Sequence, residues 1–254
     1  MSLANEHVCR KGRTKTMSYQ FEKEKKDFSD FASGRVLYNA PGSTAFPVRL
    51  TSEVFQLSQS YLNKKTDLSI YDPCCGGAHM LTAIGFLHGS AIRAIYGSDI
   101  NTDIVKIGQK NLDLLTYRGL LEREEKLTSD YLAYHKEAHS DALESVQRLK
   151  TTLHEVGEKD GKIFPFDSAG REAPPLSNIN LVITDLPYGD LVQWVSEEET
   201  PVKQLLTNVY ERLDQSNAIV AIVSEKSVVV DHPQYQRKKM VKHGKRKITI
   251  LQPI

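Results

Sequence analysis

The sequence predicts an α/β fold with a doubly wound, mostly parallel sheet, a C-terminal antiparallel hairpin and helical additions. Short apolar runs rich in β-branched residues alternate with stretches of helical periodicity, which is typical of such sheets. Aspartates follow several of these runs, at the positions where parallel strands carry functional loops. With 254 residues, of which 40% are hydrophobic and 26% charged, the chain also has the composition of a globular protein with a substantial core.

Five apolar runs are expected to be the strands of the sheet. They are residues 68–71, residues 92–98, a run that ends at 164–167, residues 181–184 and residues 218–223. Helical periodicity connects the first three at residues 80–87 and 103–115. The fifth run is apolar throughout, so we expect it to be buried on both faces of the sheet.

About fifty highly charged residues separate the second and third expected strands. Apolar side chains from Leu143 to Val156 keep a helical period there. Long loops without structure are uncommon in compact domains, so we predict a helical insertion at about 116–160.

Positive charge gathers near both ends of the chain. Residues 10–26 carry seven Lys/Arg and two acids, and residues 237–247 carry seven Lys/Arg and no acid, although the net charge of the whole chain is only +1. Residues 238–242 and 247–251 flank His243-Gly244, which predicts the antiparallel hairpin. Such segregation favours contact with a polyanion through Lys238, Lys239, Lys245 and Arg246. A solvated tail and a solvated turn would give the same pattern.

The chain divides into three expected parts. Residues 1–30 form a basic and mobile segment, residues 31–67 a cap packed over the first sheet edge, and residues 68–254 the core. Thr51 is expected to cap a helix that continues to Leu62. The N-terminus lacks a secretory signal, no apolar run could span a membrane, and the three cysteines fit neither a disulfide framework nor a metal site. We therefore expect a cytoplasmic monomer without metal.

The loop after the first expected strand reads Asp72-Pro-Cys-Cys-Gly-Gly-Ala78 and lacks the G-x-G-x-x-G spacing of dinucleotide-binding loops. A carboxylate at Asp72 would repel a pyrophosphate but attract the ammonium group of an amino-acid ligand. Asp99 can accept both ribose hydroxyls, and Asp167 can accept an adenine amino group. Together they favour S-adenosylmethionine over NAD, whereas each alone is also typical of a strand-end turn. The residues expected around this cofactor are Asp72, Cys74, Gly76, Gly77, Asp99, Ile100, Asp167 and Asp185.

The loop after the fourth expected strand reads Thr184-Asp185-Leu186-Pro187-Tyr188-Gly189 and is the most specific motif in the chain. It resembles the Asn/Asp-Pro-Pro-Tyr motif of enzymes that methylate exocyclic amines. The Asp185 carboxylate and the Leu186 carbonyl can accept hydrogen bonds from a base amine and help localise its lone pair. Pro187 stiffens the turn, and Tyr188 offers a face on which the base can stack.

Several strings of the sequence, in this order, resemble the avilamycin-resistance family of 23S rRNA guanine-N2 methyltransferases. They are ASGRVLYNAPG, AFPVRLTSEVFQ, DPCCGG, SDIN, the charged insertion, and TDLPYG followed by Trp194. The resemblance implies a Rossmann-like class I methyltransferase fold, helical additions that grip rRNA, transfer to guanine N2 and resistance to an oligosaccharide antibiotic. It also implies that Arg49 lies near the mouth of the site. Gly77-Ala78 stands where Ser-Gly is usual. Ala78 puts a methyl group where backbone and ligand approach closely, which a helical φ would tolerate.

Three other functions remain open at this point. The Asp-Leu-Pro-Tyr motif also fits methylation of adenine N6 in DNA or RNA. A silent RNA-binding protein on the same scaffold is a second alternative, against which the intact motif argues. A dehydrogenase is the weakest candidate, because the required glycine spacing is absent.

Overall fold

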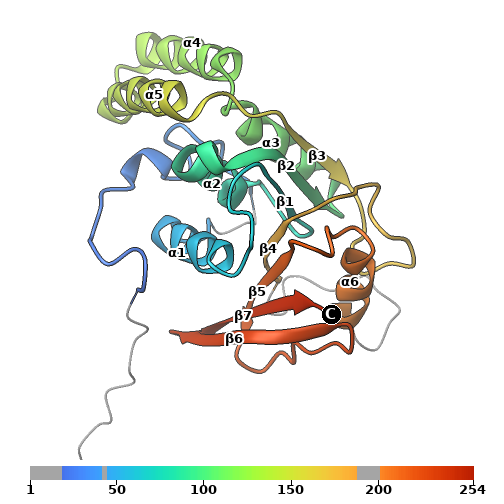
Figure 1. Cartoon of the computed structure of the whole chain (residues 1–254). Coiled ribbons are helices and arrows are strands. Elements are labelled where there is room, and N and C mark those ends of the chain that lie inside the picture. The colour runs from blue at the N-terminus through green and yellow to red at the C-terminus, as the bar shows by residue number, and fades with distance from the viewer. Residues whose placement is uncertain (1–18, 42–44, 188–200) are drawn as a thin grey trace, which may run out of the picture.

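A single mixed sheet forms the centre of the molecule in the computed structural model, which describes residues 19–41, 45–187 and 201–254 (Figure 1). Within these ranges the strands are β1 (Leu68–Asp72), β2 (Ile92–Asp99), β3 (Gly161–Pro165), β4 (Leu181–Asp185), β5 (Ile219–Glu225), β6 (Tyr235–His243) and β7 (Arg246–Pro253). Their order is β3-β2-β1-β4-β5-β7-β6. The first five strands pair in parallel, and β7 pairs antiparallel with both β5 and β6. The predicted fold class, including the C-terminal hairpin, is confirmed.

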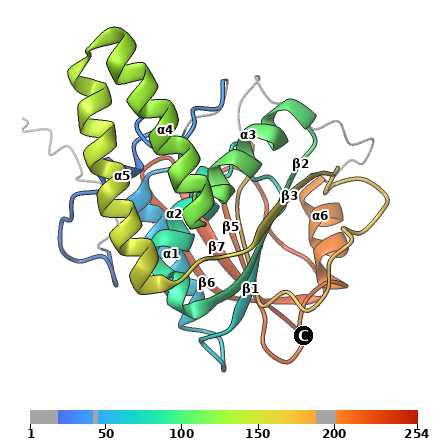
Figure 2. The same cartoon turned by 90° about the horizontal axis from the view of Figure 1, so that it is seen from above.

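Helices cover both faces of this sheet (Figures 1 and 2). In chain order they are η1 (Ser29–Phe31), α1 (Val48–Gln59), α2 (His79–His88), η2 (Gly89–Ala91), α3 (Thr102–Asp113), α4 (Tyr117–Tyr134), α5 (Glu137–Val156) and α6 (Pro201–Tyr210). Alternate strand residues belong to two apolar clusters, one on each face of the sheet. Ile70 and Ile183 belong to the cluster with α1, α2 and α3, and Tyr71 and Val182 belong to the cluster with α6. Among the described residues, no helix has the length and apolar character needed to cross a bilayer.

The chain reverses its direction of sheet growth between β1 and β4. Strands β2 and β3 extend the sheet on one side of β1, while β4 and β5 extend it on the other. Ligands of open α/β sheets bind at such a switch point, outside the carboxyl ends of the strands. The loops that follow β1 and β4 therefore delimit the candidate site.

The predicted insertion contains two antiparallel helices, α4 and α5, which project from one side of the body (Figure 2). Leu120, Leu127, Val146, Leu149 and Leu153 bury one stripe of the pair. Its outer surface is mildly acidic, since residues 117–156 hold six Lys/Arg and eight Asp/Glu.

Helix α1 differs from its prediction in both start and position. It begins at Val48, and the Pro47 carbonyl accepts the Thr51 amide at 2.9 Å. Thr51 is thus a buried residue of the first turn and cannot cap the helix. Proline is well suited to a helix start because its φ is already near the helical value. The helix also packs beside α2 and over β4 and β5, not over a sheet edge.

Residues 19–30 are packed against α1, in contrast to the expectation that the first thirty residues are mobile. The Glu53 carboxylate, 0% exposed, accepts the backbone N–H groups of Gln20, Phe21 and Glu22 at 2.7–2.9 Å. Arg49 donates to the Glu22 carbonyl at 2.6 Å from the same helix. A buried carboxylate needs such donors to replace water. We call this set of contacts the Glu53 clasp.

Candidate functional site

Asp72 closes β1 at the switch point and is 2% exposed. Its Oδ1 accepts the Cys74 amide at 3.0 Å. Burial raises the pKa of Asp72 to about 7, the nearby charges of Asp185 and Asp99 act in the same direction, and hydrogen bonds from Thr184 and Cys74 oppose them. The carboxylates that close three neighbouring strands therefore repel one another and favour a cationic ligand group between them.

Asp99 closes β2 and anchors the glycine loop that follows β1. Its Oδ2 accepts the Gly76 amide at 3.0 Å, and its Oδ1 accepts the Asn101 amide at 2.9 Å. Gly76 has a φ of +51°, which glycine adopts without a steric penalty. The neighbouring Ile100 is 50% exposed, which is unusual for a large apolar side chain beside a polar loop.

Ala78 joins the glycine loop to α2 in a left-handed conformation, with φ +55° and ψ +22°. Ala78 thus does not have the helical φ that would tolerate its methyl group. The loop must reverse before α2 begins, and the Cys75 carbonyl accepts the Ala78 amide at 2.8 Å to close that turn. A left-handed conformation costs a residue with a side chain about 1–2 kcal/mol.

Gly77 and Asn111 fasten the glycine loop to the segment before α1. A Cβ on Gly77 would lie 2.7 Å from the Ala40 Cβ, so close backbone packing requires glycine here. The Asn111 amide bridges the two segments, because its Nδ2 donates to the carbonyls of Gly77 at 2.8 Å and Tyr38 at 2.9 Å. Sequence reasoning missed Asn111, although a polar residue on the apolar face of the predicted helix 103–115 was the available signal.

A buried hydroxyl network supports the loops from below. The Tyr71 hydroxyl lies 2.7 Å from the Ser98 Oγ, and the Ser168 Oγ donates to the Pro73 carbonyl at 2.9 Å. Asn208 of α6 donates to the Ser168 carbonyl at 3.0 Å, which holds the loop after β3. Burial raises the pKa of Tyr71, so its hydroxyl remains protonated. Sequence reasoning missed this network, because its members lie far apart in the chain.

Asp167 lies in the loop held by that network. Its Oδ1 accepts the Ala169 amide at 3.0 Å, which orients the carboxylate. Cys74 and Cys75 lie in the loop after β1, and burial raises the pKa of both thiols well above the ordinary value. A raised pKa disfavours the thiolate, which is the reactive form of cysteine, so the structure gives no support for a nucleophilic role of either thiol.

Asp185 closes β4, the neighbour of β1, and begins the second loop of the site. The Leu186 amide donates to the Val223 carbonyl of β5 at 2.9 Å, and the Leu186 side chain is buried. These contacts fix the backbone on both sides of the Asp185 carboxylate. Pro187 is the last described residue of the motif; Tyr188, Gly189 and Trp194 lie outside the described residues.

Arg246 brings the C-terminal hairpin to this carboxylate. Its Nη2 lies 3.9 Å from the Asp185 Oδ2, and its guanidinium carbon lies 5.2 Å from the centre of the Phe46 ring. Sequence reasoning assigned Arg246 to RNA contact alone and missed this ion pair. The antiparallel insertion of β7 beside β5 explains it, because β5 is also the partner of β4.

The other predicted RNA-binding residues differ in the contacts that their side chains make within the protein. Lys238 and Lys245 are exposed on the hairpin, while Lys239 donates to the Gln20 Oε1 at 3.0 Å. Arg49 is engaged in the Glu53 clasp, and its guanidinium also lies 4.0 Å from the centre of the Tyr19 ring. Much of the hydrogen-bonding capacity of Arg49 is thus used inside the molecule.

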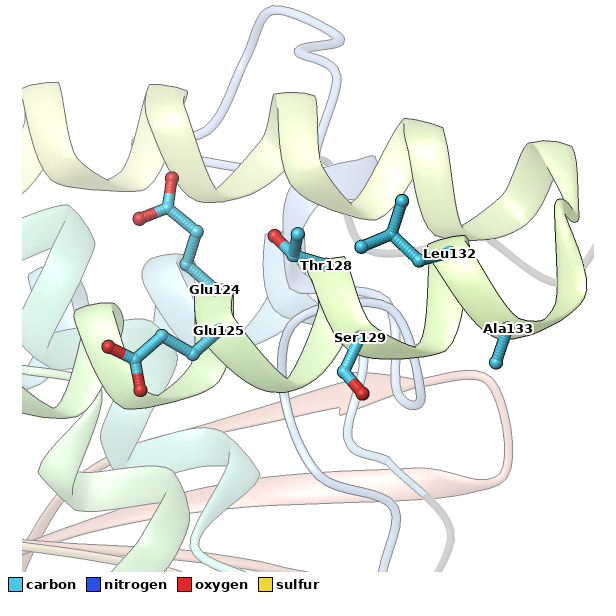
Figure 3. A pocket seen from close by; sticks show the side chains of 6 residues that line it. All are labelled: Glu124, Glu125, Thr128, Ser129, Leu132 and Ala133. Atoms are coloured by element: carbon cyan, nitrogen blue, oxygen red, sulfur yellow. The ribbon is translucent and has the colours of Figure 1, made fainter.

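A separate open hollow lies on α4 (Figure 3). It is lined by Glu124, Glu125, Thr128, Ser129, Leu132 and Ala133. One helix supplies all six residues, and the Glu124 carboxylate is paired with Lys150 at 2.6 Å. The hollow thus lacks polar groups converging from several elements, and the strand ends remain the candidate site.

Comparisons with known proteins show which family the chain resembles. A sequence model of the family described as "rRNA methyltransferase AviRa" matches residues 17–246. The chain is 32% identical over 215 residues to a 23S rRNA (guanine(2535)-N(1))-methyltransferase of Streptomyces viridochromogenes, covering 81% of this chain and 84% of the relative. The solved rRNA methyltransferase AviRa of that organism superposes with a TM-score of 0.82 at 30% identity, covering 92% of this chain and 95% of the other. TrmN from Thermus thermophilus shares the fold alone, with a TM-score of 0.53 at 11% identity, over 85% of this chain and 51% of the other.

Proposed function

The chain belongs to the AviRa family of rRNA methyltransferases, and we propose that it transfers a methyl group from S-adenosylmethionine to a guanine of 23S ribosomal RNA. The observation that carries the proposal is the meeting of Asp72 and Asp185 at the carboxyl ends of β1 and β4, on either side of the switch point. Arg246 adds a cation at the same place. Acidic and basic groups thus converge where a cofactor and a base would have to meet.

The residues present fit the cofactor. Buried Asp72 gains most from a neighbouring ammonium group, because its own burial disfavours the carboxylate. Asp99 accepts two backbone N–H groups, and its carboxylate can accept further hydrogen bonds from the ribose hydroxyls. Ile100 offers an apolar surface to the cofactor, and Asp167 can accept the adenine amino group. Gly76 and Cys74 present backbone beside this space. When bound, the cofactor supplies a methyl group on a sulfonium centre, which is already a good leaving group.

Asp185, the Leu186 carbonyl and Pro187 would hold the guanine, together with Tyr188. Guanine presents N1–H and the N2 amine side by side as donors, and both suit a carboxylate and a carbonyl. The relative's name gives N1 as its methylated atom, whereas the family resemblance of the sequence implies N2. We propose N1 for this chain. The Asp185 carboxylate would accept the N1 proton as the methyl–nitrogen bond forms, and Arg246 would complement its negative charge before transfer.

The test is transfer of tritium from labelled S-adenosylmethionine to purified 23S rRNA, with 16S rRNA, tRNA and duplex DNA as competing acceptors. We expect label in 23S rRNA alone and, after digestion, in 1-methylguanosine. Label in N2-methylguanosine would restore the N2 expectation, and label in N6-methyladenosine would overturn the proposed base. Asp185→Asn should abolish transfer, since it keeps the shape but removes the proton acceptor. Calorimetry with S-adenosylmethionine separates this loss from any change in cofactor binding.

Resistance to an oligosaccharide antibiotic would be a cellular consequence of this methylation. A susceptible host that expresses the chain should tolerate more avilamycin than the same host with the Asp185→Asn variant. Equal tolerance of the two hosts would show that the proposed methylation does not cause resistance.

A further inference from the structure

Arg246 begins a row of side chains that leads away from Asp185. It lies directly opposite His243 across the two-residue turn of the β6–β7 hairpin. Gly244, in that turn, has a φ of +56°, the left-handed value that tight hairpin turns require. The turn therefore fixes the spacing between the arginine at the site and the histidine beside it.

The row continues onto a segment from the other end of the sequence. The centre of the Tyr19 ring lies 5.7 Å from that of His243 in an edge-on arrangement, and the Arg49 guanidinium lies over the Tyr19 ring at 4.0 Å from its centre. All three side chains are half-buried, so part of each faces solvent. We call Arg246, His243, Tyr19 and Arg49 the aromatic–cation row.

The Glu53 clasp holds Tyr19 in this row. Glu53 fixes the three backbone amides that follow Tyr19, and Arg49 donates to the carbonyls of Glu22 and Lys23 at 2.6 and 3.1 Å. A solvated tail would not need a buried carboxylate to accept its backbone N–H groups, so these contacts indicate a segment with a fixed position. The position of the Tyr19 ring relative to the hairpin is thus built into the fold.

We propose that the aromatic–cation row receives unpaired nucleotides of the RNA next to the target guanine. This inference rests on the proposed function and adds the form of the substrate, an unpaired loop. Aromatic rings and guanidinium planes stack on unpaired bases, and the cations between them attract phosphates. The bases of duplex RNA are stacked inside the helix, so a duplex would gain only the electrostatic attraction between cations and phosphates.

The neighbours of His243 suit a stacking role. Burial lowers the pKa of His243, and Arg246 acts in the same direction, so the ring is neutral at neutral pH. Tyr19 and Arg246 lie against it from the N-terminal segment and from β7. A neutral ring can stack on a base without competing for phosphate.

The experiment compares binding of two RNA probes, a stem with an unpaired guanine-containing loop and a blunt duplex of the same composition. We expect the full chain to prefer the stem-loop. Tyr19→Ala should weaken stem-loop binding by about 5- to 150-fold, the range for removal of one stacked base, and leave duplex binding unchanged. Tyr19→Phe should retain the preference because it keeps the ring. Tyr117→Ala is the matched control, since Tyr117 is an exposed tyrosine on α4.

Salt dependence separates stacking from charge. Tyr19→Ala should lower affinity without changing the slope of log affinity against log salt, because the variant keeps every cation that can bind a phosphate. His243→Ala is the second variant and should act in the same way. Equal loss of affinity for both probes, an unchanged preference in both variants, or a wild-type chain without preference would each overturn the proposal. Methyl transfer to 23S rRNA is measured separately. An aromatic–cation row that does not bind unpaired nucleotides can therefore be distinguished from a chain that lacks the proposed methyltransferase activity.

Discussion

At the scale of single residues, Ala78 is strained where a glycine would not be. We predict that Ala78→Gly raises the free energy of unfolding by about 0.5–1 kcal/mol, because relief of the left-handed conformation outweighs the greater freedom of the unfolded glycine chain. Urea unfolding measures this difference. Ala133→Gly on the exposed face of α4 is the control and should instead cost about 1 kcal/mol. A loss of stability in Ala78→Gly would contradict the prediction.

Asp72 makes stability depend on pH in a direction opposite to most aspartates. Its pKa rises on folding from the ordinary 3.8 to about 7, so the folded state holds a proton that the unfolded state releases. The associated stabilisation is present below about pH 4 and is lost as the pH rises through about 7, by on the order of 4 kcal/mol. The difference in unfolding free energy between wild type and Asp72→Asn should therefore change over this range. A difference that is constant with pH would contradict it.

The same residue predicts how pH affects cofactor binding. An ammonium group beside Asp72 favours the carboxylate, so binding below about pH 7 must release a proton. Calorimetry with S-adenosylmethionine in buffers of different ionisation heat should detect that release, and affinity should rise from about pH 6 to about pH 8. Asp99→Asn is a useful comparison, since it weakens binding and, by removing a charge that raises the pKa of Asp72, reduces the release without abolishing it. Proton uptake on binding would exclude this role for Asp72.

At the scale of elements, we predict that the β6–β7 hairpin makes the main electrostatic contact with RNA. Lys238→Ala with Lys245→Ala should reduce the salt slope of RNA binding by roughly 0.7–0.9 for each phosphate that is no longer neutralised. Both side chains are exposed, and neither takes part in the Asp185 ion pair, so cofactor binding should not change. Lys65→Ala with Lys162→Ala removes the same charge from other exposed positions and should leave the slope intact. Equal slopes in both double variants would place the RNA elsewhere.

The Glu53 clasp is a second testable element. Glu53→Gln keeps the size of the side chain but replaces one acceptor oxygen with an amide group that cannot accept the N–H groups of residues 20–22. Hydrogen exchange at these three amides should accelerate, and the melting temperature should fall. Glu122→Gln, on exposed α4, should change neither. Unaltered exchange would show that the clasp is not needed to hold the segment.

The sequence predicted elements more completely than the contacts between them. All five parallel strands and the hairpin lie where apolar runs indicate, because local patterning specifies them. Thr51 was misassigned because capping preference was weighed without Pro47. Asp72 and Asp185 could be singled out by their place after strands. Arg246 beside Asp185, Asn111 on Gly77 and the Glu53 clasp could not, since each joins segments whose proximity only the folded chain defines.

At the scale of the whole molecule, charge is segregated between the hairpin and the α4–α5 pair. The resemblance implies helical additions that grip rRNA, yet residues 117–156 carry more acids than bases. We predict that Arg118→Ala with Lys126→Ala leaves the salt slope of RNA binding unchanged. Both are exposed and paired with acids of the same helix, at 2.8 and 2.7 Å. A reduced slope in this variant would assign RNA contact to α4.

The inserted position of β7 has a consequence for when activity can begin during synthesis. The ion pair with Asp185 and the row that reaches Tyr19 both depend on the β6–β7 hairpin, and β7 is translated after all the other named strands. Domains form as the chain emerges, and contacts that need its final residues form last. A nascent chain that ends before β7 therefore lacks the ion pair and the completed row, and we expect the proposed methylation to require synthesis of β7.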